Sequence, residues 1–296
     1  MTFPIPPPQG VQVALGLSEE PPHIGTGGFK AVYRMETATS PEAIKAVYVP
    51  PSGDDDEDTM RDQLIARAER EIDALGKCSS PCLVKLGSLQ PELYTIDGHD
   101  YLIYSEEFLP GETLSGWIRK EPPPSYDQLL MVFRSLIDLI RSLSADGFLH
   151  RDIKPGNVMD TGLTERPFVV LDLGIAFKMH GTELTRGGTP PGTLRYMAPE
   201  LLKPDYKDVM DFRCDLYAAG LTIYVVASGR HPFAPQPEND YATVYRIMNN
   251  RPQALAEARR DLPPGFCAII DRCMRKKPAL RYANLNLVEK SLREVM

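Results

Sequence analysis

The chain has 296 residues, of which 43% are hydrophobic and 25% are charged. This composition is sufficient for the core of one large domain or of two modest ones. A formal net charge of −7 argues against nucleic acid or an acidic membrane as a main partner, because both favour basic protein surfaces. No apolar run approaches the ~18 residues that a membrane-spanning helix needs, and the start of the chain lacks the pattern of a secretory signal.

The cysteines indicate a reducing compartment. There are five of them, an odd number, and their spacing is not typical of a zinc site. Reduced thiols are the expected state, which predicts a cytoplasmic location.

The first third of the chain has the pattern of a small sheet with one helix. Residues 1–20, rich in proline at their start, are expected to be a flexible lead-in to a domain over 21–296. The acidic run Asp54–Asp58 is expected to be a solvated loop, and apolar spacing of three and four residues predicts a helix after it, up to Leu75. Strands are predicted where β-branched and aromatic residues lie between turn formers, over Phe29–Arg34, Ile44–Val49, Leu83–Leu89 and Tyr101–Phe108.

The rest of the chain is predicted to be mainly helical. Residues 126–146 carry an apolar face wide enough to be largely buried. Further helices are predicted over Asp215–Ser228, Tyr241–Asn249, Gly265–Met274 and Leu285–Val295. The predicted fold class is therefore α+β, with a β-rich part over about 21–107, a linker at 105–111 and a larger helical part over about 112–296.

The segment His150–Asn157 carries three chemical groups at close spacing. Asp152 offers a carboxylate, Lys154 an ammonium and Asn157 an amide. Phosphoryl transfer from a nucleotide requires a base or aligner for the attacking hydroxyl, a cation for the moving phosphoryl group and an oxygen ligand for magnesium. A solvated, charged turn is the alternative interpretation. Asp172, which follows an apolar strand-like run, is predicted to be the second magnesium ligand beside Asn157.

A glycine-rich segment is a second candidate for phosphate binding. Ile24, Gly25, Gly27 and Gly28 lie at a predicted strand–turn–strand junction, where small residues let backbone amides approach phosphates. A simple hairpin turn is the alternative. Because no helix follows the glycines, the context excludes a Rossmann site.

Lys45 lies in a predicted strand after the glycine-rich segment. A lone strand lysine is usually a surface residue, but a carboxylate partner would keep this one charged and oriented towards the α- and β-phosphates. Glu71 on the predicted helix is the favoured partner, and Glu69 is the alternative.

These motifs, in their order and spacing, resemble the eukaryotic-like protein kinase superfamily from about Ile24 to the C-terminus. The resemblance implies a two-lobed fold and an active protein kinase that uses ATP with Mg²⁺, or with Mn²⁺ as an alternative. Further segments match the family's landmarks: Ala198–Glu200, Asp215–Gly220, which would anchor the catalytic loop, Gly229–Phe233, and Arg281, which would form a structural ion pair with Glu200.

The resemblance also implies roles for single residues. Lys154 and Thr193 imply that the acceptor is Ser or Thr rather than Tyr. Arg151 implies control by phosphorylation of the activation loop, because a guanidinium orders a loop by pairing with phosphate. The candidate phosphorylation sites are Thr185 and Thr189, with Thr182 as a third.

The nucleotide site is implied in the same way. The adenine is expected between Val32 and Ala43 on one side and Met159 on the other. Counting along the linker assigns the remaining positions: Ser105 as the gatekeeper, Glu106 and Phe108 as backbone hydrogen-bond sites, and Glu112 near the ribose. One departure from the family pattern is Lys30, which stands where a third glycine is usual.

Two other functions remain as alternatives. A small-molecule kinase on a related fold would generally lack the Ala198–Glu200 segment, and a pseudokinase scaffold would lack part of the chemical set that this chain retains. The expected partners are protein substrates, with a homodimer as the assembly for autophosphorylation, and neither nucleic acid nor membrane.

Overall fold

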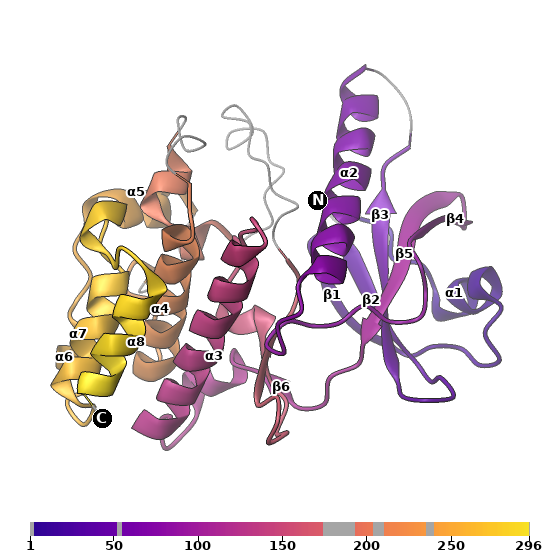
Figure 1. Ribbon diagram of the computed structural model, residues 1–296. Coiled ribbons are helices and arrows are strands. Elements are labelled where there is room, and N and C mark those ends of the chain that lie inside the picture. The colour runs from indigo at the N-terminus through magenta and orange to yellow at the C-terminus, as the bar shows by residue number, and fades with distance from the viewer. Residues whose placement is uncertain (1–2, 52–54, 174–192, 204–209, 235–239, 296) are drawn as a thin grey trace. The chain divides into compact units, whose positions relative to one another are not determined.

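Figure 1 shows a computed structural model of the chain, which describes residues 3–51, 55–173, 193–203, 210–234 and 240–295. The chain divides into two compact units. The first comprises Met1–Lys77 and Val84–Leu109, and the second comprises Cys78–Leu83 and Pro110–Met296. The change at Leu109 falls within the linker that the sequence predicts at 105–111.

The first unit is built on an antiparallel sheet of five strands in the order β1-β2-β3-β5-β4. The sheet pairs neighbours in sequence, apart from the exchange of the last two strands. Its strands are β1 (His23–Gly27), β2 (Lys30–Met35), β3 (Glu42–Val49), β4 (Glu92–Ile96) and β5 (His99–Glu107). The sheet and the helical second unit together confirm the predicted α+β class.

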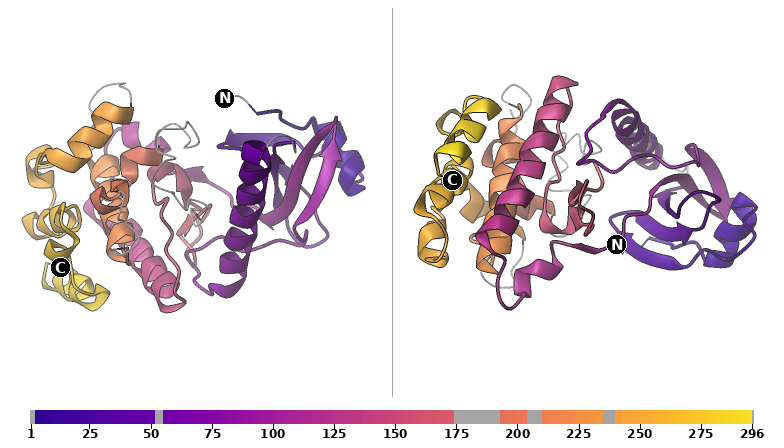
Figure 2. Two further views of the ribbon diagram at one scale, coloured as in Figure 1. Left: turned by 90° about the horizontal axis from the view of Figure 1, so that it is seen from above. Right: turned by 60° about the horizontal axis from the view of Figure 1, so that its bottom comes forward.

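A helix covers each face of this sheet. The long helix α2 (Asp55–Lys77) packs on one face through a core that includes Ala68, Val47 and Tyr104. The short helix α1 (Pro8–Leu15) packs on the other face, beside β4, with Val11 fully buried (Figures 1 and 2).

Two expectations for this unit are wrong. Residues 8–15 are not part of a flexible lead-in, because α1 buries Val11 against the sheet and the Tyr33 hydroxyl donates a hydrogen bond to the Pro6 carbonyl oxygen. The described part of the acidic run, from Asp55 to Asp58, is not a loop, because α2 begins at Asp55. Acidic residues favour the first turn of a helix, where they interact with its positive end.

The prediction of a strand over Leu83–Leu89 is wrong, because these described residues form only isolated bridges. Leu83 forms an isolated bridge with Val170, and Leu86 forms another with Glu106. The segment bonds to two different partners in turn, so no continuous ladder develops.

The second unit is mainly helical. In Figure 2, α4 packs between α3 and α7. A capping box begins α3, in which the Ser125 hydroxyl oxygen accepts from the Gln128 N–H and the Gln128 side chain accepts from the Ser125 N–H. The helices are α3 (Tyr126–Ala145), α4 (Arg213–Ser228), α5 (Asp240–Asn249), α6 (Leu255–Ala258), α7 (Pro264–Cys273) and α8 (Leu285–Glu294).

A small sheet and several 3₁₀ turns complete the second unit. Its strands are β6 (Glu112–Thr113), β7 (Val158–Asp160) and β8 (Phe168–Val170), and its turns include η1 (Gly116–Arg119), η2 (Pro155–Asn157), η5 (Thr193–Tyr196), η6 (Pro199–Leu202) and η8 (Pro278–Leu280). Among the described residues, no helix has the length and apolar character needed to span a membrane.

Candidate active site

The glycine-rich segment forms the hairpin between β1 and β2. Gly27 pairs with Lys30, so Gly28 and Phe29 make up a two-residue turn. Gly28 has a φ of 59°, a left-handed conformation that favours glycine. A Cβ atom added at Gly25 or Gly27 would meet no other atom within 4 Å. The backbone of this hairpin is therefore open to a close-lying ligand.

One face of the first-unit sheet carries several residues that the sequence assigns to the nucleotide site. Val32 lies opposite Lys45, and Ala43 lies opposite Glu106. Side chains alternate along a strand, so these four residues share one face of the sheet. Ile24, in β1, is 47% exposed.

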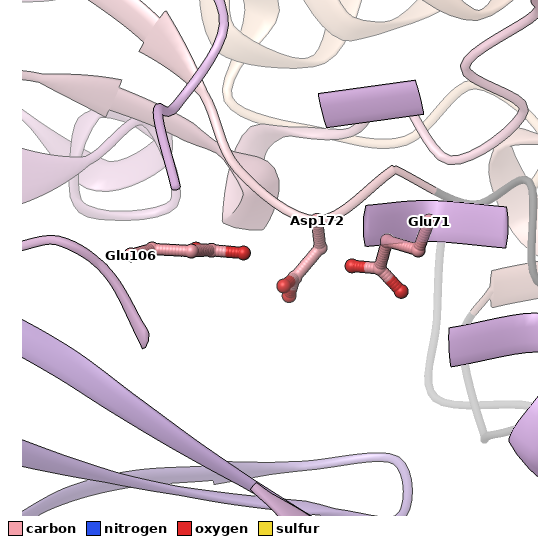
Figure 3. Close-up of side chains that lie close together, drawn as sticks. All are labelled: Glu71, Glu106 and Asp172. Carbon is pink, nitrogen blue, oxygen red and sulfur yellow. The ribbon is translucent and has the colours of Figure 1, made fainter. Parts of the chain in front are cut away.

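On that face, four charged residues form two ion pairs. The Lys45 Nζ atom lies 2.6 Å from a Glu106 carboxylate oxygen, and the Lys30 Nζ atom lies 3.4 Å from a Glu71 carboxylate oxygen. The Glu71 and Glu106 carboxylate groups approach within 4.8 Å of each other. Figure 3 shows the two carboxylates and also labels Asp172, which belongs to the second unit.

Helix α2 presents Glu71, rather than Glu69, to the sheet. Glu71 is buried, whereas Glu69 is exposed. Glu71 shares its side of the helix with the buried residues Ala68 and Leu75. The structure thus selects between the two glutamates, while the pairing of Glu71 with Lys45 stays a prediction.

The predicted place of Ser105 at the nucleotide site is wrong. Ser105 lies opposite Ile44, on the face of the sheet that Lys45 does not share. Its hydroxyl donates to a Glu42 carboxylate oxygen at 2.6 Å and accepts from the Leu89 N–H at 2.9 Å. A one-residue error in counting along a strand moves every side chain to the other face.

The same error affects the linker after β5. The Phe108 N–H donates to the Pro41 carbonyl oxygen at 3.1 Å, so this group is occupied and is not the backbone donor that the sequence predicts. Glu112, predicted to lie near the ribose, is in β6 of the second unit and pairs with Lys120 at 2.6 Å. Met159, in β7, lies opposite Val169.

In the second unit, the residues of the phosphotransfer motif converge on the Asp152 carboxylate. The Lys154 Nζ atom donates to both carboxylate oxygens, at 2.9 and 2.7 Å. The Asn157 amide nitrogen donates to the Asp152 carbonyl oxygen at 2.9 Å and to its carboxylate at 2.8 Å. Burial raises the pKa of the Asp152 carboxyl, while the Lys154 ammonium and the Asn157 amide oppose this shift.

Helix α4 fixes the backbone of this loop from below. The Asp215 carboxylate is buried and accepts from the His150 N–H at 2.8 Å and from the Arg151 N–H at 2.7 Å. Burial raises the pKa of Asp215 to about 6, although both hydrogen bonds oppose that shift. Burial also lowers the pKa of His150 to about 4, which keeps its ring neutral at pH 7. The structure thereby gives the Asp215 segment the anchoring position that the resemblance implies.

Asp172 lies two residues after the end of β8, in a segment bonded to the loop that holds Asn157. The Leu171 N–H donates to the Asn157 carbonyl oxygen at 2.7 Å, which ties the two segments together. Asp172 has a φ of 49° and Arg151 a φ of 65°, a backbone conformation that is costly for residues other than glycine. Such strain is concentrated at functional sites.

Asn157 and Asp172 are suitable ligands for a hard cation. Both hydrogen bonds of the Asn157 amide use its nitrogen, so neither consumes the amide oxygen. Carboxylate and amide oxygens are the ligands that magnesium prefers. The chemistry of these donors therefore fits the metal that the sequence predicts.

Comparison with known proteins identifies the family. The model of the protein kinase domain matches residues 19–292. The chain belongs to the protein kinase family. This kinase is 28% identical over 262 residues to the serine/threonine-protein kinase PknH of Mycobacterium tuberculosis (strain ATCC 25618 / H37Rv), covering 88% of this chain and 39% of PknH. It is also 28% identical over 279 residues to the serine/threonine-protein kinase pkn3 of Myxococcus xanthus, covering 92% of this chain and 48% of pkn3.

The kinase spans less than half the length of these curated relatives. Among solved structures, the kinase domain of Mycobacterium tuberculosis PknI has 20% sequence identity and a TM-score of 0.63, with coverage of 93% of this chain and 94% of that one. This similarity confirms the protein kinase fold.

A buried ion pair of the kinase confirms a further expectation. The Arg281 guanidinium binds the Glu200 carboxylate through two bonds of 2.5 and 2.7 Å. The side chains are 0% and 5% exposed, respectively. The pair joins the Ala198–Glu200 segment to the C-terminal helices, as the resemblance implies.

Some predicted residues of the kinase cannot be placed. Thr182, Thr185 and Thr189 lie outside the described residues. Thr193 begins η5, where only its backbone is described.

The Glu106 side chain, which pairs with Lys45, was not among the predicted side chains, because only the backbone of this residue had been assigned to the site. The alternation of the buried Leu102 and Tyr104 with Glu106 was the available signal, since all three face α2.

Proposed function

We propose that this kinase transfers the γ-phosphoryl group of ATP to serine or threonine hydroxyl groups of proteins. The observation that carries this proposal is the hydrogen-bonded set of Asp152, Lys154 and Asn157. Transfer to a hydroxyl requires a base or aligner, a cation at the transferring group and oxygen ligands for a metal. These three residues supply one of each within a single short loop.

Asp152 orients the attacking hydroxyl and accepts its proton. Its raised pKa makes the carboxylate a better proton acceptor than an ordinary aspartate. Lys154 stabilises the negative charge on the transferring phosphoryl group, and its bonds to both Asp152 oxygens fix the distance between base and cation. The names of the relatives and the presence of Lys154 two residues after Asp152 support Ser or Thr as the acceptor.

Asn157 and Asp172 would hold Mg²⁺, or Mn²⁺ in its place. When bound, the metal neutralises negative charge on the phosphates. Lys45 would bind the α- and β-phosphates, and the open backbone of the β1–β2 hairpin would let its N–H groups approach them. The adenine packs against Val32 and Ala43.

When the count along the linker is shifted by one residue, a different backbone N–H becomes the donor to the adenine. Leu109, rather than Phe108, provides this N–H, because that of Phe108 is occupied by Pro41. The Glu107 carbonyl is the accompanying acceptor. Ser105 takes no part, since its side chain lies on the other face of the sheet.

Regulation acts through phosphorylation of Thr185 or Thr189, in trans within a transient homodimer. Arg151 is the receiving cation. Its Nε atom is buried, and among the described residues it has no hydrogen-bond partner. A phosphate group supplies the acceptor oxygens that a guanidinium binds. The five free cysteines support a cytoplasmic location for the domain.

The proposal is tested by replacing the base while keeping its shape. Asp152→Asn should lower incorporation of labelled phosphate into casein by at least about a thousandfold, because it removes the proton acceptor. The affinity for ATP should change little. Asp160→Asn is the matched control, since Asp160 lies on β7 close in sequence but outside the hydrogen-bonded set. It should retain activity.

Phosphoamino-acid analysis of the labelled casein identifies the acceptor. Phosphoserine and phosphothreonine are expected. Undiminished transfer by Asp152→Asn, or transfer by neither the wild-type protein nor the Asp160→Asn control, would contradict the proposal.

A further inference from the structure

The Glu106 side chain faces the proposed nucleotide side of the sheet. Ala43 pairs with Glu106, and Lys45 pairs with Tyr104, so Lys45 and Glu106 are diagonal neighbours on β3 and β5. Long side chains reach across such a diagonal. The carboxylate of Glu106 and the ammonium of Lys45 accordingly meet at 2.6 Å.

Both members of this pair are buried and rigidly mounted. The side chains of Lys45 and Glu106 are 7% and 2% exposed. Their strands β3 and β5 are adjacent in the sheet, and each has another strand on its far side. A buried charge is tolerated only with a partner, and here the partner is fixed by the same sheet.

Two further charged residues of the first unit lie beside this pair. Glu71 comes within 4.8 Å of Glu106, a distance at which two carboxylates repel each other. Lys30 lies 3.4 Å from Glu71. Two lysines and two glutamates thus share one face, and Lys30, which departs from the family's glycine, supplies the second cation.

From this geometry we infer that Glu106 is a positioning residue for Lys45: its sheet-borne carboxylate holds the Lys45 ammonium in place for the nucleotide phosphates. The inference rests on the proposed function in assigning the phosphates to Lys45. Because Glu106 and Lys45 belong to one sheet, this hold does not require Glu71, which is carried by helix α2. Glu106 therefore contributes to nucleotide binding through Lys45.

The test is a double-mutant cycle on nucleotide affinity. The probe is the fluorescent analogue TNP-ATP with Mg²⁺, and the variants are Glu106→Gln, Lys45→Met and the double variant. Glu106→Gln should raise the dissociation constant about tenfold, within the coupling range of residues in contact. The same change should have almost no effect in the Lys45→Met background, because Glu106 acts only through Lys45.

Glu42→Gln is the matched control. Glu42 is also a buried strand glutamate, but it binds Ser88 and Ser105 on the opposite face. It should leave the dissociation constant unchanged. If Glu106→Gln does not fold, as judged by circular dichroism, Glu106→Asp replaces it in the cycle. This variant keeps the charge but shortens the reach, and a several-fold weakening is expected.

Two results would overturn the inference. One is an unchanged dissociation constant in the folded Glu106 variant, and the other is an equal effect of the Glu106 change with and without Lys45. Since the cycle measures binding, it stands apart from phosphoryl transfer. A protein that binds TNP-ATP with the expected coupling but phosphorylates nothing would refute the proposed function and leave this inference intact.

Discussion

Removing the charge of Glu200 provides a quantitative test of the second unit's core. The Arg281 side chain is fully buried and donates two bonds to Glu200. It also donates to the carbonyl oxygens of Arg275 and Arg213 at 2.8 Å and of Lys276 at 3.3 Å. In Glu200→Gln the guanidinium stays buried without its counter-charge, and the new amide NH₂ group faces one of its N–H donors.

Such a loss typically costs about 3–5 kcal/mol of unfolding free energy. The three carbonyl contacts remain in the variant, so we expect a value near the lower end, about 3 kcal/mol. For a unit of this size that corresponds to a fall in melting temperature of about 6–12 °C.

Trp117 provides the assay, because it is the only tryptophan in the sequence and is buried in the second unit. Urea unfolding is followed by its fluorescence. Lys290→Gln is the control, since it breaks an exposed pair with Glu294 and should cost less than about 0.5 kcal/mol. A loss below about 1 kcal/mol for Glu200→Gln would refute the reasoning, since a buried arginine would then tolerate the absence of its counter-charge.

Three further predictions concern stability. Burial lowers the pKa of His231 to about 4, below its unfolded value, so its contribution is present above pH 6.5 and is lost as the pH falls towards 4. The difference in unfolding free energy between wild type and His231→Gln, measured by urea unfolding, should therefore shrink from pH 7 to pH 5; a constant difference would contradict the assigned pKa. Gly111→Ala should destabilise the second unit by more than Gly147→Ala, which should cost about 1–2 kcal/mol. Both glycines have positive φ, but a Cβ atom at Gly111 would lie 1.9 Å from a backbone oxygen, whereas one at Gly147 would meet nothing within 4 Å. Equal losses of unfolding free energy in the two variants, followed by Trp117 fluorescence, would refute the clash. In α1, Val11→Asp should lose about 1.5–3 kcal/mol of burial and speed proteolysis of the first unit, whereas Val13→Asp, at a site that is 76% exposed, should behave as wild type; similar cleavage rates for the two would show that α1 is not docked.

Local sequence predicted the structure correctly where a strong pattern of residues agreed with the local hydrogen bonds. The helix predicted over 126–146 is observed as Tyr126–Ala145, because its apolar face and its capping box agree. The residues predicted for phosphoryl transfer also lie together, since Asp152, Lys154 and Asn157 fall within six residues and both Lys154 and Asn157 bond to the Asp152 carboxylate.

Prediction failed where the outcome depended on a distant partner. The start of the chain is rich in proline, yet α1 is docked, because the sheet offers an apolar face that buries Val11. The Leu83–Leu89 segment has strand-like residues, yet it bonds to two different partners in turn. Neither partner is visible in the local pattern.

The sequence by itself determined the family, the two-part organisation and the chemical groups available for phosphoryl transfer, because these depend on the residues present and on their short spacing. Only the tertiary structure decided that the Glu106 carboxylate meets Lys45. That choice depends on the register between β3 and β5, which places Glu106 on the face of Lys45 and Ser105 on the other. Register is set by the pairing of strands that lie far apart in the chain, and a shift of one residue exchanges the two faces.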